Sequence, residues 1–146
     1  MSKSNTFEND LLLLIFNNTD IANIGDAAGL LGSTTPGSLY WSLHTADPGE
    51  AGTAITSETA YTGYARVAAA RSGSGFTVTG NSVSPPANVD FGECTGSAGG
   101  ALTHFGVVNT ASGAGKLLYS GTLTPNITMD VGVIPRLKST STITED

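Results

Sequence analysis

The chain has 146 residues, of which 39% are hydrophobic and only 12% are charged, and its formal net charge is −6. This length fits a single domain with its own core, and the patterned apolar content argues against disorder. The basic residues are scattered rather than clustered, so we expect no direct binding to nucleic acid. They are Lys3, Arg66, Arg71, Lys116, Arg136 and Lys138.

A single cysteine, Cys94, excludes an intrachain disulfide and any zinc site built on several thiolates. The apolar run at residues 11–16 is too short for the hydrophobic region of a signal peptide or for a membrane span. We therefore expect a chain that is made in a reducing cytoplasm and has no membrane partner.

The N-terminal segment predicts a helix. Asn5 is a candidate N-cap, and Glu8 follows three residues later, as in a capping box. An apolar stripe recurs at helical spacing, and residues 17–18 are expected to end the helix. A second short helical turn is expected over residues 20–28. The stripe consists of Phe7, Leu11, Leu14 and Ile15, widened by Leu12, Leu13 and Phe16.

From residue 38 onward the pattern predicts only strands and turns. Residues 39–44 alternate, with Leu39, Trp41 and Leu43 expected on one face, and Asp47-Pro48 then forces a rigid turn. Further strands are expected at 66–71, 75–80, 88–91, 101–108 and 116–123, the last ended by Pro125. Residues 127–133 alternate most clearly of all, and 139–144 form a last strand or tail.

These roughly seven or eight strands, spaced about 8–12 residues apart, are typical of an antiparallel two-sheet sandwich. No helix-length segment separates them, which argues against βαβ units. We predict a mainly β, jelly-roll-like sandwich with a short N-terminal helix. Residues 1–146 are expected to form one domain, with a helical segment at 1–30 and the sandwich at 38–146.

No motif carries recognisable catalytic or cofactor chemistry. His44 and His104 lack metal-ligand spacing, and residues 73–75 fail as a nucleophile elbow. Residues 114–116 resemble the end of a phosphate-binding loop, but Thr110 and Leu117 break that pattern. We expect no enzyme activity, no cofactor and no metal.

The candidate functional surface is therefore an interface. Asp47, Pro48, Gly49 and Glu50 form a projecting loop, and a second glycine-rich loop is expected at 92–100. Phe7 and Leu11 belong to the helical stripe, which either docks into a partner or covers an open end of its own sandwich. The low share of charged residues also suits a surface that neighbouring subunits cover.

Four segments resemble small structural proteins of tailed bacteriophages, often described as tail-fibre-like, some of which are similar to jelly-roll cement proteins on phage heads. The similar segments are 39–49 (LYWSLHTADPG), 61–67 (YTGYARV), 103–107 (THFGV) and 112–121 (SGAGKLLYSG). The chain lacks the long repeats or heptads of a trimeric shaft, which favours cement over fibre.

The resemblance implies a capsid cement or decoration protein on the head exterior, assembled in the host cytoplasm. Its expected partners are the major capsid protein and further copies of itself, as a dimer rather than a trimer. The alternative is a tail-fibre or tail-tip module that binds a host glycan through exposed Trp41, Tyr61 and Tyr64. A third hypothesis is a small hydrolase that uses His44 and His104.

Overall fold

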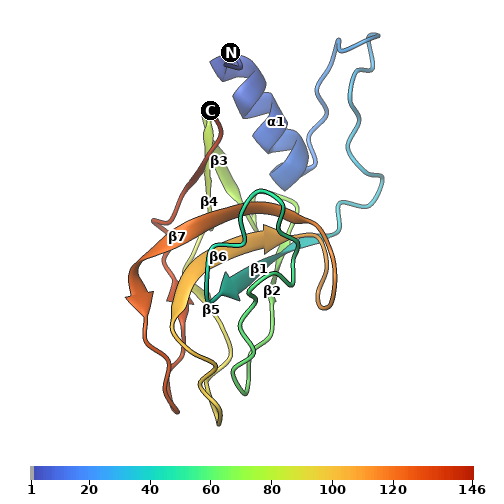
Figure 1. Cartoon of the computed structure of the whole chain (residues 1–146). Coiled ribbons are helices and arrows are strands. Elements are labelled where there is room, and N and C mark those ends of the chain that lie inside the picture. Colours follow the sequence, from blue (N-terminus) through green and yellow to red (C-terminus); the bar gives the residue numbers. More distant parts are fainter. Residues whose placement is uncertain (1) are drawn as a thin grey trace. The chain divides into compact units, whose positions relative to one another are not determined.

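The computed structural model describes residues 2–146, which form two compact units (Figure 1). The helical unit contains the chain up to Ser38, together with Ala69–Asn88 and Lys138–Asp146. The sheet unit contains Leu39–Ala68 and Val89–Leu137. We describe each unit by itself, and the expectation of one domain over 1–146 stays a prediction.

The N-terminal helix α1 spans Asn5–Asn17, which confirms the predicted helix. Its N-cap is Ser4, one residue before the predicted Asn5, and the Ser4 hydroxyl accepts a hydrogen bond from Phe7 N at 3.3 Å. Asn18 ends the helix in a left-handed conformation with φ 58°. Asparagine tolerates that conformation at a helix end better than most residues do.

The buried face of α1 takes only part of the predicted stripe, namely the widening residues Leu12 and Phe16. Glu8, Leu12 and Phe16 are its buried residues, spaced four apart, whereas Phe7 is 37% exposed. The Phe16 ring packs on Phe76 with centroids 4.9 Å apart. Apolar residues surround most of this helix, so their spacing alone does not show which of them face the core.

Residues 20–28 do not form the predicted helical turn. Ile21 pairs with Leu30 in an isolated antiparallel bridge, and Ile24 is 39% exposed instead of facing inward. Asp26 Oδ1 accepts hydrogen bonds from the backbone of Ala28 and Gly29, a turn that competes with helix. Figure 1 shows this part of the chain running out and back beyond α1.

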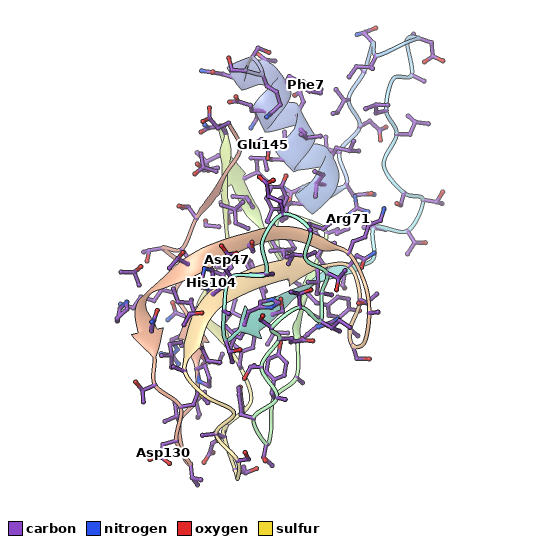
Figure 2. The ribbon with its side chains drawn as sticks, in the orientation of Figure 1. Phe7, Asp47, Arg71, His104, Asp130 and Glu145 are labelled. Carbon is purple, nitrogen blue, oxygen red and sulfur yellow. The ribbon has the colours of Figure 1, made fainter. Side chains whose placement is uncertain are left out.

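A three-stranded sheet completes the helical unit, in the order β3-β4-β9 (Thr77–Thr79, Ser82–Ser84 and Ile143–Thr144). The strand β4 was missed because it is short and adjoins a Pro-Pro break. Arg71, labelled in Figure 2, donates to the carbonyls of Ile15 and Leu14, each at 2.7 Å. It thus places a cation at the negative end of the helix dipole.

A four-stranded sheet has the order β2-β1-β6-β7 (Val67–Ala70, Ser38–His44, Leu102–Val108 and Leu117–Ile127). It belongs to the sheet unit except for Ser38 and for the last two residues of β2. A short antiparallel pair, β5 (Val89–Asp90) with β8 (Arg136–Leu137), belongs to the same unit. Trp41 and Phe105 lie on the core face with ring centroids 6.1 Å apart, and both are buried. The mainly β, antiparallel, sandwich-like fold class with a short N-terminal helix is confirmed.

The predicted strand at 127–133 is wrong. Strand β7 does not end before Pro125 but continues to Ile127, and Asp130 then starts a turn by accepting a hydrogen bond from Val133 N at 3.1 Å. Gly132 has φ 89°, which strands do not adopt, and Val131 is 64% exposed. Pro125 is tolerated because β7 is an edge strand, where a missing N–H need not break the ladder.

Candidate functional site

The predicted interface residues 47–50 lie in a longer loop, residues 45–57, which follows β1 and covers His44 on the outer face of the four-stranded sheet. On that face, Ser42 and His44 are both 0% exposed, although the alternation of β1 points them away from the Trp41 side. The loop itself satisfies Nδ1 of His44, which lies 2.9 Å from the carbonyl oxygen of Thr56. The loop is therefore attached to the sheet through a buried histidine.

The hydrogen-bond partners of His44 assign its tautomer. Nδ1–H donates to the Thr56 carbonyl, which leaves Nε2 to accept from the Ser42 hydroxyl at 2.9 Å. Burial lowers the pKa of His44 below its ordinary value, with the Thr56 carbonyl opposing that shift. Gly106 lies beneath this pair, and a Cβ there would approach Ser42 Oγ to 2.7 Å. The close packing requires glycine at that position.

A second anchor fixes the far end of the loop. The Arg66 guanidinium contacts both carboxylate oxygens of Glu58, with Nε–Oε1 at 2.6 Å and Nη2–Oε2 at 2.7 Å. The same guanidinium donates to the carbonyls of Thr110 and Gly113, each at 2.9 Å. The Glu58 carboxylate raises the pKa of Arg66. One cation thus ties the loop to the turn between β6 and β7.

Tyr64 contacts this anchor directly, and the Tyr61 ring packs against Tyr64. Tyr64 Oη donates to Glu58 Oε1 at 2.9 Å and accepts from Leu43 N at 3.2 Å, and burial raises the pKa of its hydroxyl. Tyr61 Oη donates to the Gly92 carbonyl at 2.7 Å, and burial raises its pKa to about 12. Every polar atom of both rings is used within the fold.

The expectation that Trp41, Tyr61 and Tyr64 are exposed aromatics is therefore wrong. Trp41 and Tyr61 are each 2% exposed, and Tyr64 is half-buried with its ring stacked on Phe91 at 6.4 Å. Alternation along a strand predicts the side of the sheet on which Trp41 lies, but it does not predict whether other parts of the chain bury that side. None of the three offers a free ring face of the kind that stacks on sugars.

The loop and strand β7 enclose an open groove of about 350 Å³, which we call the β7 groove. Its rim carries Asp47 and Glu50, both exposed, and its floor is the stretch from Leu117 to Thr122. Asp47 Oδ1 accepts a hydrogen bond from Gly49 N at 2.9 Å, which stiffens the turn. Figure 2 labels Asp47 and His104, the histidine that lies beside Thr122 in the sheet.

The structure distributes the predicted interface residues between the units. Asp47, Gly49 and Glu50 are exposed together on the β7 groove, whereas Pro48 is buried beneath them. Phe7 and Leu11 belong to the helical unit, where Leu11 is half-buried. Sequence reasoning missed the anchors Arg66, Glu58 and Tyr64, because nothing in the pattern brings residues 58, 64 and 66 to the turn at 110–113.

The buried polar groups of this site already have hydrogen-bond partners within the fold. Ser42 and His44 have the spacing of a nucleophile and base, but neither is exposed, and the Nδ1 partner is a carbonyl rather than a carboxylate. Across residues 2–146, no three His, Cys, Asp or Glu side chains gather as metal ligands. Over that same stretch, no helix is long and apolar enough to cross a bilayer.

The fold and site thus define a structural class of protein, a rigid β module whose buried polar groups hold its loops. The chain belongs to the family of the podophage GP4 fibre I protein gp80, whose family model matches residues 2–144. The match confirms the resemblance to small structural proteins of tailed bacteriophages. A comparison with curated proteins found no match.

Proposed function

We propose that this chain is a non-catalytic structural subunit of the phage virion and belongs to its fibre apparatus. The observation that carries the proposal is the extent of the family match, which spans residues 2–144 and so includes both units. The fibre relationship therefore concerns the whole described fold and not an appended segment. Its work is to contact other virion proteins and further copies of itself.

The buried anchors support a structural role over an enzymatic one. His44 and Arg66 direct their polar atoms at the loop and at neighbouring turns, and Ser42 holds the His44 ring, so together they stiffen the surface that carries Asp47 and Glu50. A stiff loop loses little conformational freedom when it binds, which favours assembly. No cofactor enters the proposal.

A second candidate position is the head exterior, where the chain would act as cement between major capsid protein subunits. It is favoured by the structure, in which α1 has 13 residues and the longest strand described has 11. Elements of this length do not build an extended shaft. Many copies with modest interfaces would stabilise a head through multivalency.

Locating the chain in purified virions tests the proposal. Immunogold labelling with antibodies against the purified chain should mark the fibres, and quantitative mass spectrometry should give a fixed number of copies per particle. Label confined to the head, with lower resistance to heat and osmotic shock in particles lacking the chain, would select the cement position. Absence of the chain from mature particles would overturn both.

Variants of the loop test how the chain is incorporated. Asp47→Ala combined with Glu50→Ala should reduce the number of copies per virion, because both side chains are exposed on the β7 groove. Asp130→Ala is the matched control, since it removes an exposed carboxylate from a different turn. Equal incorporation of the two variants would show that the loop does not belong to the interface. If no catalysis is involved, Ser42→Ala, which removes the hydroxyl paired with His44, should lower infectivity no more than it lowers incorporation.

A further inference from the structure

We propose that two copies of this chain associate edge to edge through β7, with Lys116 of each copy against the acidic rim, Asp47 and Glu50, of the other. The proposal rests on the structural role proposed above and specifies one of the contacts through which that role is performed. Four observations within the sheet unit carry it: an unprotected strand edge, a groove beside that edge, an unpaired cation, and the register that aligns them.

Strand β7 is an edge strand with little of the usual protection in its first part, where its pairing with β6 is interrupted by a bulge at Leu118 and proline comes only at Pro125. It ends the order β2-β1-β6-β7, and its first eight residues, 117–124, contain no charged residue and no proline. Natural edge strands are usually short or carry charges or proline, which prevents pairing with other chains. The opposite edge follows that rule, because β2 has four residues and lies between Arg66 and Arg71. Of the two edges of this four-stranded sheet, the β7 edge is therefore the one open to a further strand.

The exposed residues of β7 alternate as a strand-pairing surface requires. Leu118, Ser120, Thr122 and Thr124 are exposed, whereas the intervening residues are half-buried or buried. Leu118 is 36% exposed, which is high for a leucine in the middle of a sheet unit. An added strand would cover this leucine and satisfy the outward backbone groups of β7.

The charges beside this edge are complementary. Lys116 directly precedes β7 and is exposed, and among residues 2–146 the structure gives its ammonium no ion pair. Asp47 and Glu50 are exposed on the rim of the β7 groove. The groove and the residue that precedes its floor therefore carry two acidic groups and one cation that form no ion pair among residues 2–146, which is what self-association needs.

The direction of the loop places these charges at opposite ends of the groove. His44 pairs with His104 and His104 with Thr122, so Asp47, three residues after His44, lies at the Thr122 end. Ala54 N donates to the Gly115 carbonyl, so the later part of the loop lies at the Lys116 end. Within one copy, Lys116 and Asp47 are thus separated by the length of the groove.

An antiparallel pair of β7 strands brings the two ends together. Residues opposite one another in such a pair share a face. The two-fold axis therefore passes between the two copies of one residue, which faces itself across the pair. Here that residue is Tyr119 or Ser120, at the centre of the groove floor. Lys116, which precedes the bulge at Leu118, then lies close to Thr122 or Thr124 of the other copy. In either register the ammonium reaches the end of the groove where Asp47 lies. The contact is closed and symmetric, so it gives a dimer.

Charge variants measured by analytical ultracentrifugation test the proposal. The wild-type chain should show a concentration-dependent monomer–dimer equilibrium. Lys116→Glu should raise the dissociation constant about tenfold or more, because it sets like charges together. Lys138→Glu is the matched control, with the same change in net charge at an exposed lysine of the helical unit, and it should leave the constant unchanged.

Reversing the rim should restore association. Asp47→Lys and Glu50→Lys, added to Lys116→Glu, exchange the two signs and should return the dissociation constant toward the wild-type value. A wild-type chain that stays monomeric overturns the proposal. So does a dimer that Lys116→Glu leaves intact, or one that the reversed rim fails to restore.

Cysteine cross-linking provides a readout that does not depend on charge. In the double variant Tyr119→Cys, Ser120→Cys, either register brings two introduced cysteines directly opposite, outside the bulge at Leu118 and within the Cα separation that a disulfide spans. Oxidation should give a covalent dimer, whereas Val131→Cys, an exposed control site, should not. The native Cys94 is buried and does not interfere. Absence of the covalent dimer overturns the proposal.

These results are separable from the test of the proposed function. A monomeric chain that is still found at fixed copy number in virions would overturn the β7 contact and leave the structural role in place. A dimer that forms through β7 but is absent from virions would support this contact and overturn the role.

Discussion

Arg66 and Glu58 form a two-point ion pair in which the guanidinium is almost completely enclosed, with side-chain exposures of 2% for Arg66 and 15% for Glu58. The remaining N–H groups of Arg66 donate to Thr110, Gly113 and Ala54. All the donors are used, so the pair acts as a fixed joint between the interface loop and the β6–β7 turn.

Glu58→Gln should be strongly destabilising. The variant keeps the shape of the side chain but leaves a buried guanidinium without its counter-charge, which costs about 3 kcal/mol or more of unfolding free energy. Denaturant unfolding followed by tryptophan fluorescence measures the loss. The control is Asp90→Asn, which breaks the ion pair with Arg136, where both side chains are about half exposed. That variant should be indistinguishable from wild type, and equal losses would contradict the account.

The stability of the chain should fall as the pH drops through the histidine range. Burial lowers the pKa of His44 below 6.5, so the unfolded chain binds the proton at a higher pH than the folded chain does. The contribution of His44 is therefore complete above the unfolded pKa and is lost progressively below it, with a slope of at most about 1.4 kcal/mol per pH unit. Unfolding curves between neutral and mildly acidic pH measure it.

Substituting the two histidines separately identifies the source of that slope. His44→Gln should flatten the slope, although it also removes the hydrogen bonds to Ser42 and Thr56. His104→Gln removes the imidazole next to His44 in the sheet and leaves those hydrogen bonds in place. The His104→Gln variant should keep the pH slope of the wild-type chain. If His104→Gln flattened the slope and His44→Gln did not, His44 would not be the titrating group.

Thr59→Val is expected to be neutral or stabilising, unlike most substitutions of buried residues. Thr59 is 4% exposed, and its hydroxyl oxygen has no hydrogen-bond partner among residues 2–146. An unsatisfied buried hydroxyl costs about 1–3 kcal/mol, and valine removes it while keeping the branched shape. Thermal unfolding should show an equal or higher midpoint. A clear loss of stability would mean that the hydroxyl has a partner in solution.

The elements that the sequence predicted well are those in which local pattern and burial agree. Residues 39–44 and 101–108 alternate and are flanked by turn residues, and they became β1 and β6. The helix ended at Asn18 as expected because asparagine is a recognisable stop. In these cases propensity, periodicity and tertiary packing all favour the same structure.

The failures occurred where backbone chemistry competes with side-chain pattern. Residues 127–133 alternate well, but Asp130 and Gly132 favour a turn, and that turn is what forms. Residues 20–28 have helical spacing, yet Asn23 adopts a left-handed backbone conformation and the Asp26 carboxylate accepts hydrogen bonds from the backbone that follows it. Periodicity reports which residues are apolar and says nothing about the cost of left-handed positions.

The candidate site was predictable only in part. Asp47, Gly49 and Glu50 were selected as a projecting loop because Asp-Pro-Gly is recognisable turn chemistry, and they are exposed on the β7 groove. The burial of Ser42 and His44 was not predictable, because it depends on the loop folding back over the outer face of the sheet. Such coverage is a tertiary contact that alternation along one strand cannot indicate.

Paired truncations in α1 should separate its inner face from its outer one. Leu12→Ala removes a side chain that is 0% exposed and should cost about 2–5 kcal/mol, whereas Phe7→Ala removes a larger side chain that is 37% exposed and should cost much less. Hydrophobic size alone would give the reverse order. Chemical denaturation of both variants, with helicity followed by circular dichroism, gives the comparison. If the Phe7 variant proved the less stable of the two, the buried face of α1 would be the stripe that helical spacing first suggested, and the contact between Phe16 and Phe76 would not position the helix.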